Sequence, residues 1–234
     1  MRRLVLLLLL LAPAALAQDP PARPALMGIF GKDDRQPFEP VDRPWSAIGR
    51  LNREAGGFCT GTLVGPRQVL TAAHCLRHPR TKAMLPAHTL HFVAGYRRGE
   101  YAVHRRAASY VTGEGKGAEA DWAVVTLSDD TGIKPLPVRT GDTPMSAALL
   151  RAGYSQDRAH LPTRAANCSV QGTPPGLLLH DCDATRGDSG SALLTREGGE
   201  LAVVGLHVGT LSGPQTVNVG VPAASFAAAV KGKR

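Results

Sequence analysis

Three short segments carry residue types that could together perform nucleophilic catalysis. Ser189 is flanked by Gly187-Asp188 and Gly190, a composition that permits a tight turn. His74 follows three small residues, and Asp121 stands directly before the apolar run 122–127. A serine hydroxyl is a poor nucleophile unless a base lies within hydrogen-bond reach and a third group orients that base. These three residues are therefore a candidate nucleophile, base and orienting carboxylate.

The turn around Ser189 could also stabilise the charge that acyl transfer creates. Attack on a carbonyl leaves a negative oxygen, which backbone N–H groups stabilise when they point at it. The N–H groups of Gly187 and Ser189 can point at a single spot because glycine has few steric limits. Alone, each segment also has an ordinary explanation: a surface loop at 187–191, a structural histidine, or an aspartate that caps a turn.

Together the segments resemble the chymotrypsin-like serine peptidases, in which TAAHC, D-[IL]-A-[LV]-[LV] and GDSGS occur in this order. The resemblance extends from about residue 45 to 226. It implies that Ser189 is the nucleophile, His74 the general base and then acid, and Asp121 the orienting carboxylate. The N–H groups of Gly187 and Ser189 would form the oxyanion hole. The expected fold is all-β: two six-stranded antiparallel β-barrels, a site in the cleft between them, and a short C-terminal helix.

The four cysteines fall into two local pairs, Cys59 with Cys75 and Cys168 with Cys182. An even number in an exported chain favours disulfides, although three pairings are possible and the spacing does not choose between them. A metal site at the His-Cys cluster 74–78 is the alternative. We expect no metal, because zinc ligands are usually paired more tightly. The resemblance implies a Cys59–Cys75 bridge beside the histidine, and Cys168–Cys182 in the second barrel.

The N-terminus has the pattern of a secretory leader. A basic start at 1–3 precedes the apolar run 4–11, and Ala-Leu-Ala follows at 15–17. A membrane-spanning helix needs about 20 apolar residues, so an uncleaved anchor is the less favoured alternative. We therefore predict a signal peptide at 1–17 and a secreted protein, extracellular or periplasmic, with no membrane association afterwards.

The formal net charge is +8, and it falls by two when the arginines of the leader leave. Lysines and arginines are scattered except at the tail 231–234, without aromatic residues placed to stack on bases. This distribution favours a solvated basic surface over nucleic-acid binding. We expect polypeptide substrates, no nucleic acid, no cofactor and a monomer.

Short apolar or alternating runs between Gly, Pro and Asp predict many strands. The first set is expected at 45–51, 59–64, 68–71, 90–94 and 122–127, and the second at 147–153, 168–172, 191–194, 201–207 and 216–221. A linker is expected at 128–138 and a helix at 223–231. The domains are then a leader (1–17), a propeptide or extended arm (18–44), the first barrel (45–130), and the second barrel with the helix (131–234).

Two residues suggest opposite substrate specificities. Asp183 precedes Ser189 by six residues and matches the family position at the base of the primary specificity pocket, where a carboxylate accepts Lys or Arg. His207 matches a position where glutamate-specific members place a histidine. Either residue could instead be structural, and in one pocket they could pair with each other. We expect basic specificity first, then small or apolar, then glutamate.

The segment 31–38 is unlike the Ile-Val-Gly-Gly start of animal trypsins and is similar to the arm of a bacterial branch related to glutamyl endopeptidases. In the animal enzymes a new N-terminal ammonium pairs with the carboxylate before the nucleophile, here Asp188. The amine or cation that meets Asp188 in this chain is not readable from the sequence.

The sequence thus predicts a secreted serine endopeptidase that acts through an acyl-enzyme intermediate. The alternative is a catalytically silent homologue that binds partners through its basic surface, although the candidate triad and both glycines are present. A lipid- or ester-hydrolysing enzyme is less favoured, because Ser189 lacks the Gly-x-Ser-x-Gly elbow and the order of the triad differs.

Overall fold

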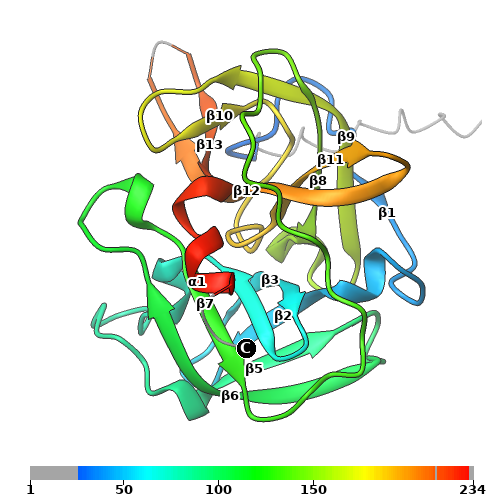
Figure 1. The fold of residues 1–234 in the computed structure, drawn as a ribbon, viewed down its shortest axis with the longest axis vertical. Helices are drawn as coiled ribbons and strands as arrows, with labels where there is room; N and C mark the ends of the chain where they lie inside the picture. Colours follow the sequence, from blue (N-terminus) through cyan, green and yellow to red (C-terminus); the bar gives the residue numbers. More distant parts are fainter. Residues whose placement is uncertain (1–25, 214, 232–234) are drawn as a thin grey trace, which may run out of the picture.

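The computed structural model describes residues 26–213 and 215–231, which form two antiparallel β-barrels stacked on one another (Figure 1). The expected leader at 1–17 lies outside the described residues. Within those residues, no helix combines the length and the apolar character needed to cross a membrane. The all-β, two-barrel architecture expected from the sequence is confirmed.

Six strands close the first barrel, in the order β2-β3-β4-β7-β6-β5. They are β2 (Ile48–Arg53), β3 (Phe58–Gly65), β4 (Gln68–Thr71), β5 (Leu90–Ala94), β6 (Val103–Thr112) and β7 (Ala123–Leu127). Every residue of β3 is buried, whereas Ala107 is the only buried residue of β6. Strand β6 was not predicted because polar residues such as His104, Arg105 and Arg106 interrupt any apolar run.

The second barrel follows the order β8-β9-β10-β13-β12-β11, and β11 pairs with β8 to close it. Its strands are β8 (Ala148–Tyr154), β9 (Pro162–Gly172), β10 (Leu178–His180), β11 (Ala192–Glu197), β12 (Glu200–Leu211) and β13 (Val217–Pro222). The two-residue β1 (Gln36–Pro37) adds to β9. Of the six strands of this barrel, β10, three residues long, is the one without a counterpart among the expected strands.

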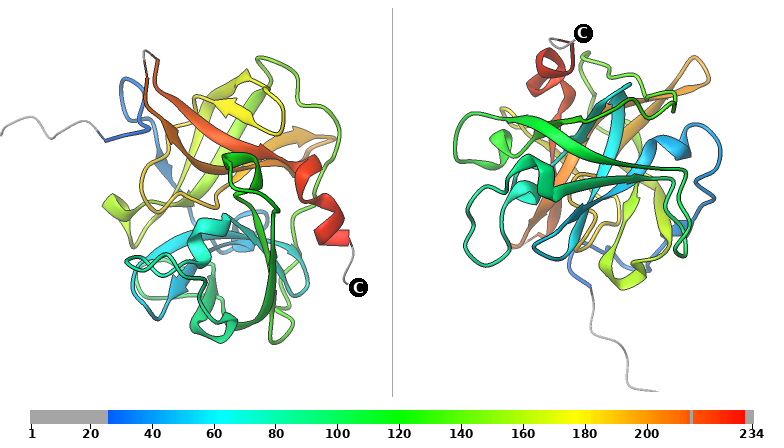
Figure 2. Two further views of the ribbon diagram at one scale, coloured as in Figure 1. Left: turned by 90° about the vertical axis from the view of Figure 1, so that its left-hand side faces the viewer. Right: turned by 90° about the horizontal axis from the view of Figure 1, so that it is seen from below.

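Two segments hold the barrels together. One is the chain that connects them, and the other is the C-terminal segment 223–231. Leu136 donates its N–H to Leu63 of the first barrel, and Val203 of the second donates to Pro137. The expected C-terminal helix is divided into a 3₁₀ turn, η6 (Ala223–Ser225), and α1 (Ala227–Lys231). Between them the buried Phe226 packs against Trp122 of the first barrel, so α1 descends toward that barrel (Figure 2).

Two disulfides are present, with the pairings that the resemblance implies. Cys59–Cys75 joins β3 to the 3₁₀ turn η2 (Ala73–Leu76), and Cys168–Cys182 joins β9 to the segment after β10. One continuous core of buried side chains extends through both barrels, and a smaller cluster surrounds the second disulfide. The disulfide Cys59–Cys75 therefore holds η2, which contains His74, against β3.

Candidate active site

His74 and Asp121 form a doubly hydrogen-bonded pair at the edge of the first barrel. His74 lies in η2 after β4, and Asp121 follows the 3₁₀ turn η4 (Ala118–Ala120). The ring Nδ1 of His74 lies 2.7 Å from Asp121 Oδ2, and its backbone N–H donates to Oδ1 at 2.8 Å. With a carboxylate at Nδ1, the ring carries its proton there. Nε2 is then free to accept a proton.

Ser189 approaches this pair from the second barrel. Its carbonyl accepts the N–H of Thr60 in β3 at 2.9 Å, which fixes the serine turn to the first barrel. The Sγ atom of Cys75 lies 3.8 Å from that carbonyl and 3.7 Å from His74 Nε2. The disulfide thus contacts both His74 and Ser189. Within 26–213 and 215–231, no hydrogen bond joins Ser189 Oγ to His74 Nε2, and such bonds are often long before substrate binds.

In the turn 187–190, two N–H groups have no acceptor among the described residues. The Arg186 carbonyl accepts the Gln156 N–H at 2.7 Å, and in a trans peptide the next N–H, that of Gly187, points the opposite way. Neither Gly187 nor Ser189 donates its N–H to another described residue. Gly187 has φ +96°, and a Cβ there would lie 2.7 Å from the Tyr154 carbonyl oxygen. Position 187 therefore requires glycine, and the N–H groups of Gly187 and Ser189 are both unpaired within the described residues.

Asp188 meets a side chain from inside the second barrel. Arg151, in the middle of β8, donates from Nη1 to Asp188 at 2.7 Å, and both side chains are fully buried. The Ser155 hydroxyl and the Thr185 N–H complete the carboxylate's partners at 2.6 and 2.9 Å. Arg151 also donates to the Asp183 carbonyl. The turn before Ser189 is thus anchored without an N-terminal ammonium.

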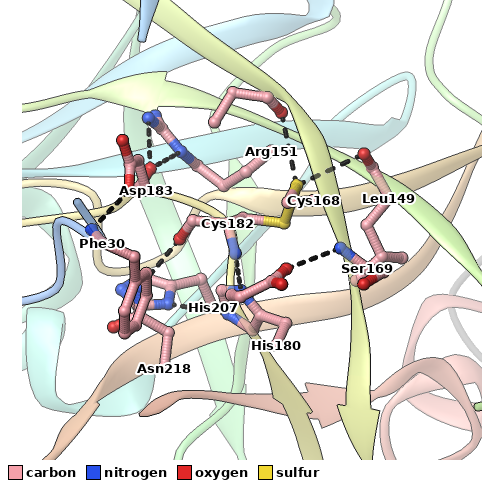
Figure 3. Close-up of a disulfide and its surroundings, with 12 residues drawn as sticks. Phe30, Leu149, Arg151, Cys168, Ser169, His180, Cys182, Asp183, His207 and Asn218 are labelled. Atoms are coloured by element: carbon pink, nitrogen blue, oxygen red, sulfur yellow. Dashed lines mark hydrogen bonds between the residues drawn. A yellow bond between two sulfur atoms is a disulfide. The ribbon is translucent and has the colours of Figure 1, made fainter. Parts of the chain in front are cut away.

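Asp183, expected at the base of a specificity pocket, binds the N-terminal arm (Figure 3). Its Oδ1 accepts the Phe30 N–H at 2.8 Å, and its Oδ2 accepts the Asp34 N–H at 3.1 Å. The residue is only 4 % exposed, and burial raises the pKa of its carboxyl. Both carboxylate oxygens therefore already have N–H donors, and Asp183 makes no hydrogen bond to His207 among the described residues.

A second anchor of the arm is the buried Arg35. Its guanidinium donates to Asp33 and Asp157, each at 2.8 Å from Nη2, and to the Ser155 hydroxyl at 2.8 Å. The hydrogen bond from Arg35 lowers the pKa of Asp33 to about 2. Because Ser155 also donates to Asp188, this network connects the arm to the turn before Ser189.

His207 belongs to a directional chain of hydrogen bonds that the sequence analysis did not foresee (Figure 3). The Cys182 N–H donates to His180 Nδ1 at 3.2 Å, and His180 Nε2 lies 3.1 Å from His207 Nδ1. Burial lowers the pKa of both histidines, to about 3 for His180, so both rings are neutral at pH 7. His180 must then carry its proton on Nε2, and this N–H donates a hydrogen bond to His207 Nδ1.

This chain determines the tautomer of His207. Since its Nδ1 accepts, the neutral ring carries its proton on Nε2, and that N–H has no partner among the described residues. The backbone of His207 lies against the nucleophile turn, because its carbonyl accepts the Gly190 N–H and its N–H donates to Ser191, both at 2.8 Å. His207 thus has one unpaired ring donor, and its backbone is hydrogen-bonded to the two residues that follow Ser189.

A cavity of about 410 Å³ opens beside His74 and Asp121. Arg77 and the glycine-rich loop 113–118, which includes Lys116, form its other walls. The candidate catalytic pair therefore has open space on the side of the first barrel.

Comparison with known proteins identifies the family and the fold of the chain. The family model described as Trypsin matches residues 33–230. A solved structure of a Glu endopeptidase in complex with MPD superposes with a TM-score of 0.75 and 20% sequence identity. The match covers 86% of this chain and 96% of that chain. At 20% identity, the structural match shows a shared fold and nothing more.

Proposed function

Because the chain belongs to the trypsin family of serine endopeptidases, we propose that Ser189, His74 and Asp121 cleave its polypeptide substrates through an acyl-enzyme intermediate. The observation that carries this proposal is the pair of hydrogen bonds by which both Asp121 oxygens hold His74. The pair leaves Nε2 as the only proton acceptor of the ring, and Cys75 Sγ lies within 4 Å of both Nε2 and the Ser189 carbonyl.

In the first step, Ser189 Oγ attacks the substrate carbonyl carbon while its proton moves to His74 Nε2. The Asp121 carboxylate stabilises the imidazolium that forms. The N–H groups of Gly187 and Ser189 stabilise the oxyanion. When the intermediate collapses, the C–N bond breaks and His74 returns the proton to the leaving amine. A water molecule then repeats the sequence on the ester and releases Ser189.

We further propose a preference for an acceptor side chain, glutamate or glutamine, before the cleaved bond. The expectation of basic specificity depended on a free Asp183 carboxylate, and both of its oxygens accept N–H groups of the arm. The unpaired Nε2–H of His207 can donate instead to a side-chain oxygen. The shared fold with a Glu endopeptidase supports the same direction.

The leader pattern at 1–17 and the two disulfides together support export of the protein. Disulfides persist in oxidising compartments, and Cys59–Cys75 contacts the proposed catalytic residues directly. We therefore propose a secreted enzyme.

Hydrolysis of a peptide library by the wild type, Ser189→Ala and His207→Leu tests both proposals. The wild type should cleave after Glu or Gln, and Ser189→Ala should not cleave. His207→Leu should lose roughly 10- to 100-fold in kcat/KM for these substrates, because a buried donor to the substrate is gone. Equal cleavage by wild type and Ser189→Ala would refute the triad, whereas cleavage after Lys would refute only the specificity. If neither protein cleaves, the silent binding module becomes the better account.

A further inference from the structure

A second cavity, of about 430 Å³, lies on the face where the segment before β2 meets the β11–β12 hairpin. In Figure 1 these are the blue segment and the orange hairpin at the right-hand side. The cavity shares no lining residue with the one beside His74. Its lining residues are Arg43, Pro44, Trp45, Leu136, Arg164, Arg196, Gly199, Glu200 and Leu201.

The cavity concentrates positive charge on an aromatic wall. The Arg164 guanidinium lies 5.3 Å from the centre of the Trp45 ring, and Arg164 is only half-exposed. In the described part of the chain, neither Arg164 nor Arg196 has a carboxylate partner. The single acidic residue of the lining, Glu200, pairs with Arg43 at 2.8 Å. The lining of this cavity therefore carries the guanidinium groups of Arg43, Arg164 and Arg196 against the single carboxylate of Glu200.

One donor of this site is buried and unused. Arg43 Nε has no hydrogen-bond partner within the described chain, although Nη1 of the same side chain is paired. A buried N–H without an acceptor is costly, so a ligand oxygen or a water would be favoured there.

The remaining surface is apolar. Leu136 and Leu201 are buried in the lining, and the rings of Pro44 and Trp45 lie beside them. A ligand that combines an oxyanion with an aliphatic or aromatic group would meet both parts of the cavity. Its volume is within the range of ordinary ligand pockets, about 300–1,000 Å³.

We propose that this cavity is an exosite that binds an acidic segment of a polypeptide substrate, with a carboxylate on Arg164 and a neighbouring apolar side chain on Trp45. Guanidinium groups bind carboxylates through charge-assisted hydrogen bonds, and the indole ring contributes apolar contact. A sulfated sugar could bind the arginines but would offer no apolar group to Leu136 and Leu201. The inference rests on the proposed peptidase function, because polypeptides are then the molecules presented to this surface.

Isothermal titration of Ser189→Ala with acetyl-(Leu-Glu)₃-amide tests the exosite without any hydrolysis. Arg164→Gln should raise the Kd roughly tenfold, because one charge-assisted contact is lost. Arg80→Gln, which removes an exposed arginine outside both cavities, should leave the Kd unchanged. The glutamine version of the peptide should bind no better to the parent than to Arg164→Gln.

Three results would overturn the exosite. In the first, Arg164→Gln binds the acidic peptide as tightly as the parent. In the second, His207→Leu abolishes the binding and Arg164→Gln does not, which would assign the peptide to the catalytic cleft. In the third, a heparin hexasaccharide binds at Arg164 and the peptide does not. Since binding is measured on an inactive variant, a failure here leaves the proposed triad untouched.

Discussion

The carboxylate of Asp121 makes both of its hydrogen bonds to one residue, one to the ring of His74 and one to its backbone N–H. This arrangement fixes the side chain of the base relative to its own backbone. Because His74 is half-exposed, packing alone would not hold the ring in one orientation. The orientation of the base therefore depends on Asp121.

Asp121→Asn should retain the fold and lose most of the activity. If the amide NH₂ faces the ring, Nδ1 must accept, and the neutral imidazole then carries its proton on Nε2, where it cannot take the proton of Ser189. We expect kcat to fall about 10⁴-fold, the loss seen when this tautomer is wrong in such a triad. Steady-state kinetics with a Glu-containing peptide measure it, and a loss of less than tenfold would contradict the assigned role.

Some site residues were accessible from the sequence and others were not. His74 and Ser189 stand in local motifs, so short segments identified them. Arg151 had an unused signal, because a charge in the middle of an apolar strand must be paired when buried. His180 and Thr60 had none, since their partners His207 and Ser189 are brought close only by the closed barrels.

At the level of elements, the turn before Ser189 is held by the buried pair of Arg151 and Asp188. Arg151→Met should remove the cation and leave Asp188 as an unpaired buried carboxylate. We expect the free energy of unfolding to fall by about 3–5 kcal/mol. We also expect kcat/KM to fall, because the turn 187–190 is then held less firmly. Urea denaturation and peptide hydrolysis measure the two effects.

The double variant Arg151→Met/Asp188→Asn provides the control. It removes both charges, so it should recover part of the lost stability. If Arg151→Met unfolds like the wild type, the pair does not anchor the turn. If the double variant is less stable than the single one, the loss did not come from the unpaired carboxylate.

The arm 26–37 is the second such element, and its attachment should weaken in Asp183→Asn. An asparagine can accept one N–H but presents its NH₂ to the other, so the bond to Phe30 or to Asp34 is lost. Amide hydrogen exchange at 28–34 should accelerate several-fold. Unchanged protection would show that the arm does not depend on Asp183, and Asp34→Ala, which keeps its backbone N–H, serves as the matched control.

Strands with an apolar face were predictable, and those without one were not. Residues 68–71 and 90–94 have the observed boundaries of β4 and β5, because each is buried along most of its length. Strand β6 has a single buried residue, and β10 is only three residues long. Their pairing comes from barrel closure, which no local pattern records.

For the molecule as a whole, the neutral buried histidines make stability depend on pH. The pKa of His180 is lowered to about 3 by burial, against 6.5 in the unfolded chain. Below pH 6.5 the unfolded state takes up a proton that the folded state does not bind. The contribution of the neutral His180 to stability is therefore fully present above pH 6.5 and is lost as the pH falls toward 3. His207 contributes in the same direction.

Urea denaturation between pH 7 and pH 4 should show this loss, with a slope of at most about 1.4 kcal/mol per pH unit for each histidine. His180→Gln, whose amide can replace both hydrogen bonds, should reduce the slope. The lowered pKa of Asp33, about 2, adds a further loss only below its ordinary value of 3.8. A pH-independent midpoint, or a slope that His180→Gln leaves unchanged, would contradict the neutral pair.

The two barrels meet where the chemistry is proposed, since Thr60 of the first holds the Ser189 carbonyl of the second. The decisive measurement is reaction with a fluorophosphonate serine probe, followed by peptide mass spectrometry. We predict one adduct, on Ser189, which is absent in Ser189→Ala and strongly reduced in His74→Ala. No adduct in the folded wild type, or an adduct on another serine, would contradict it.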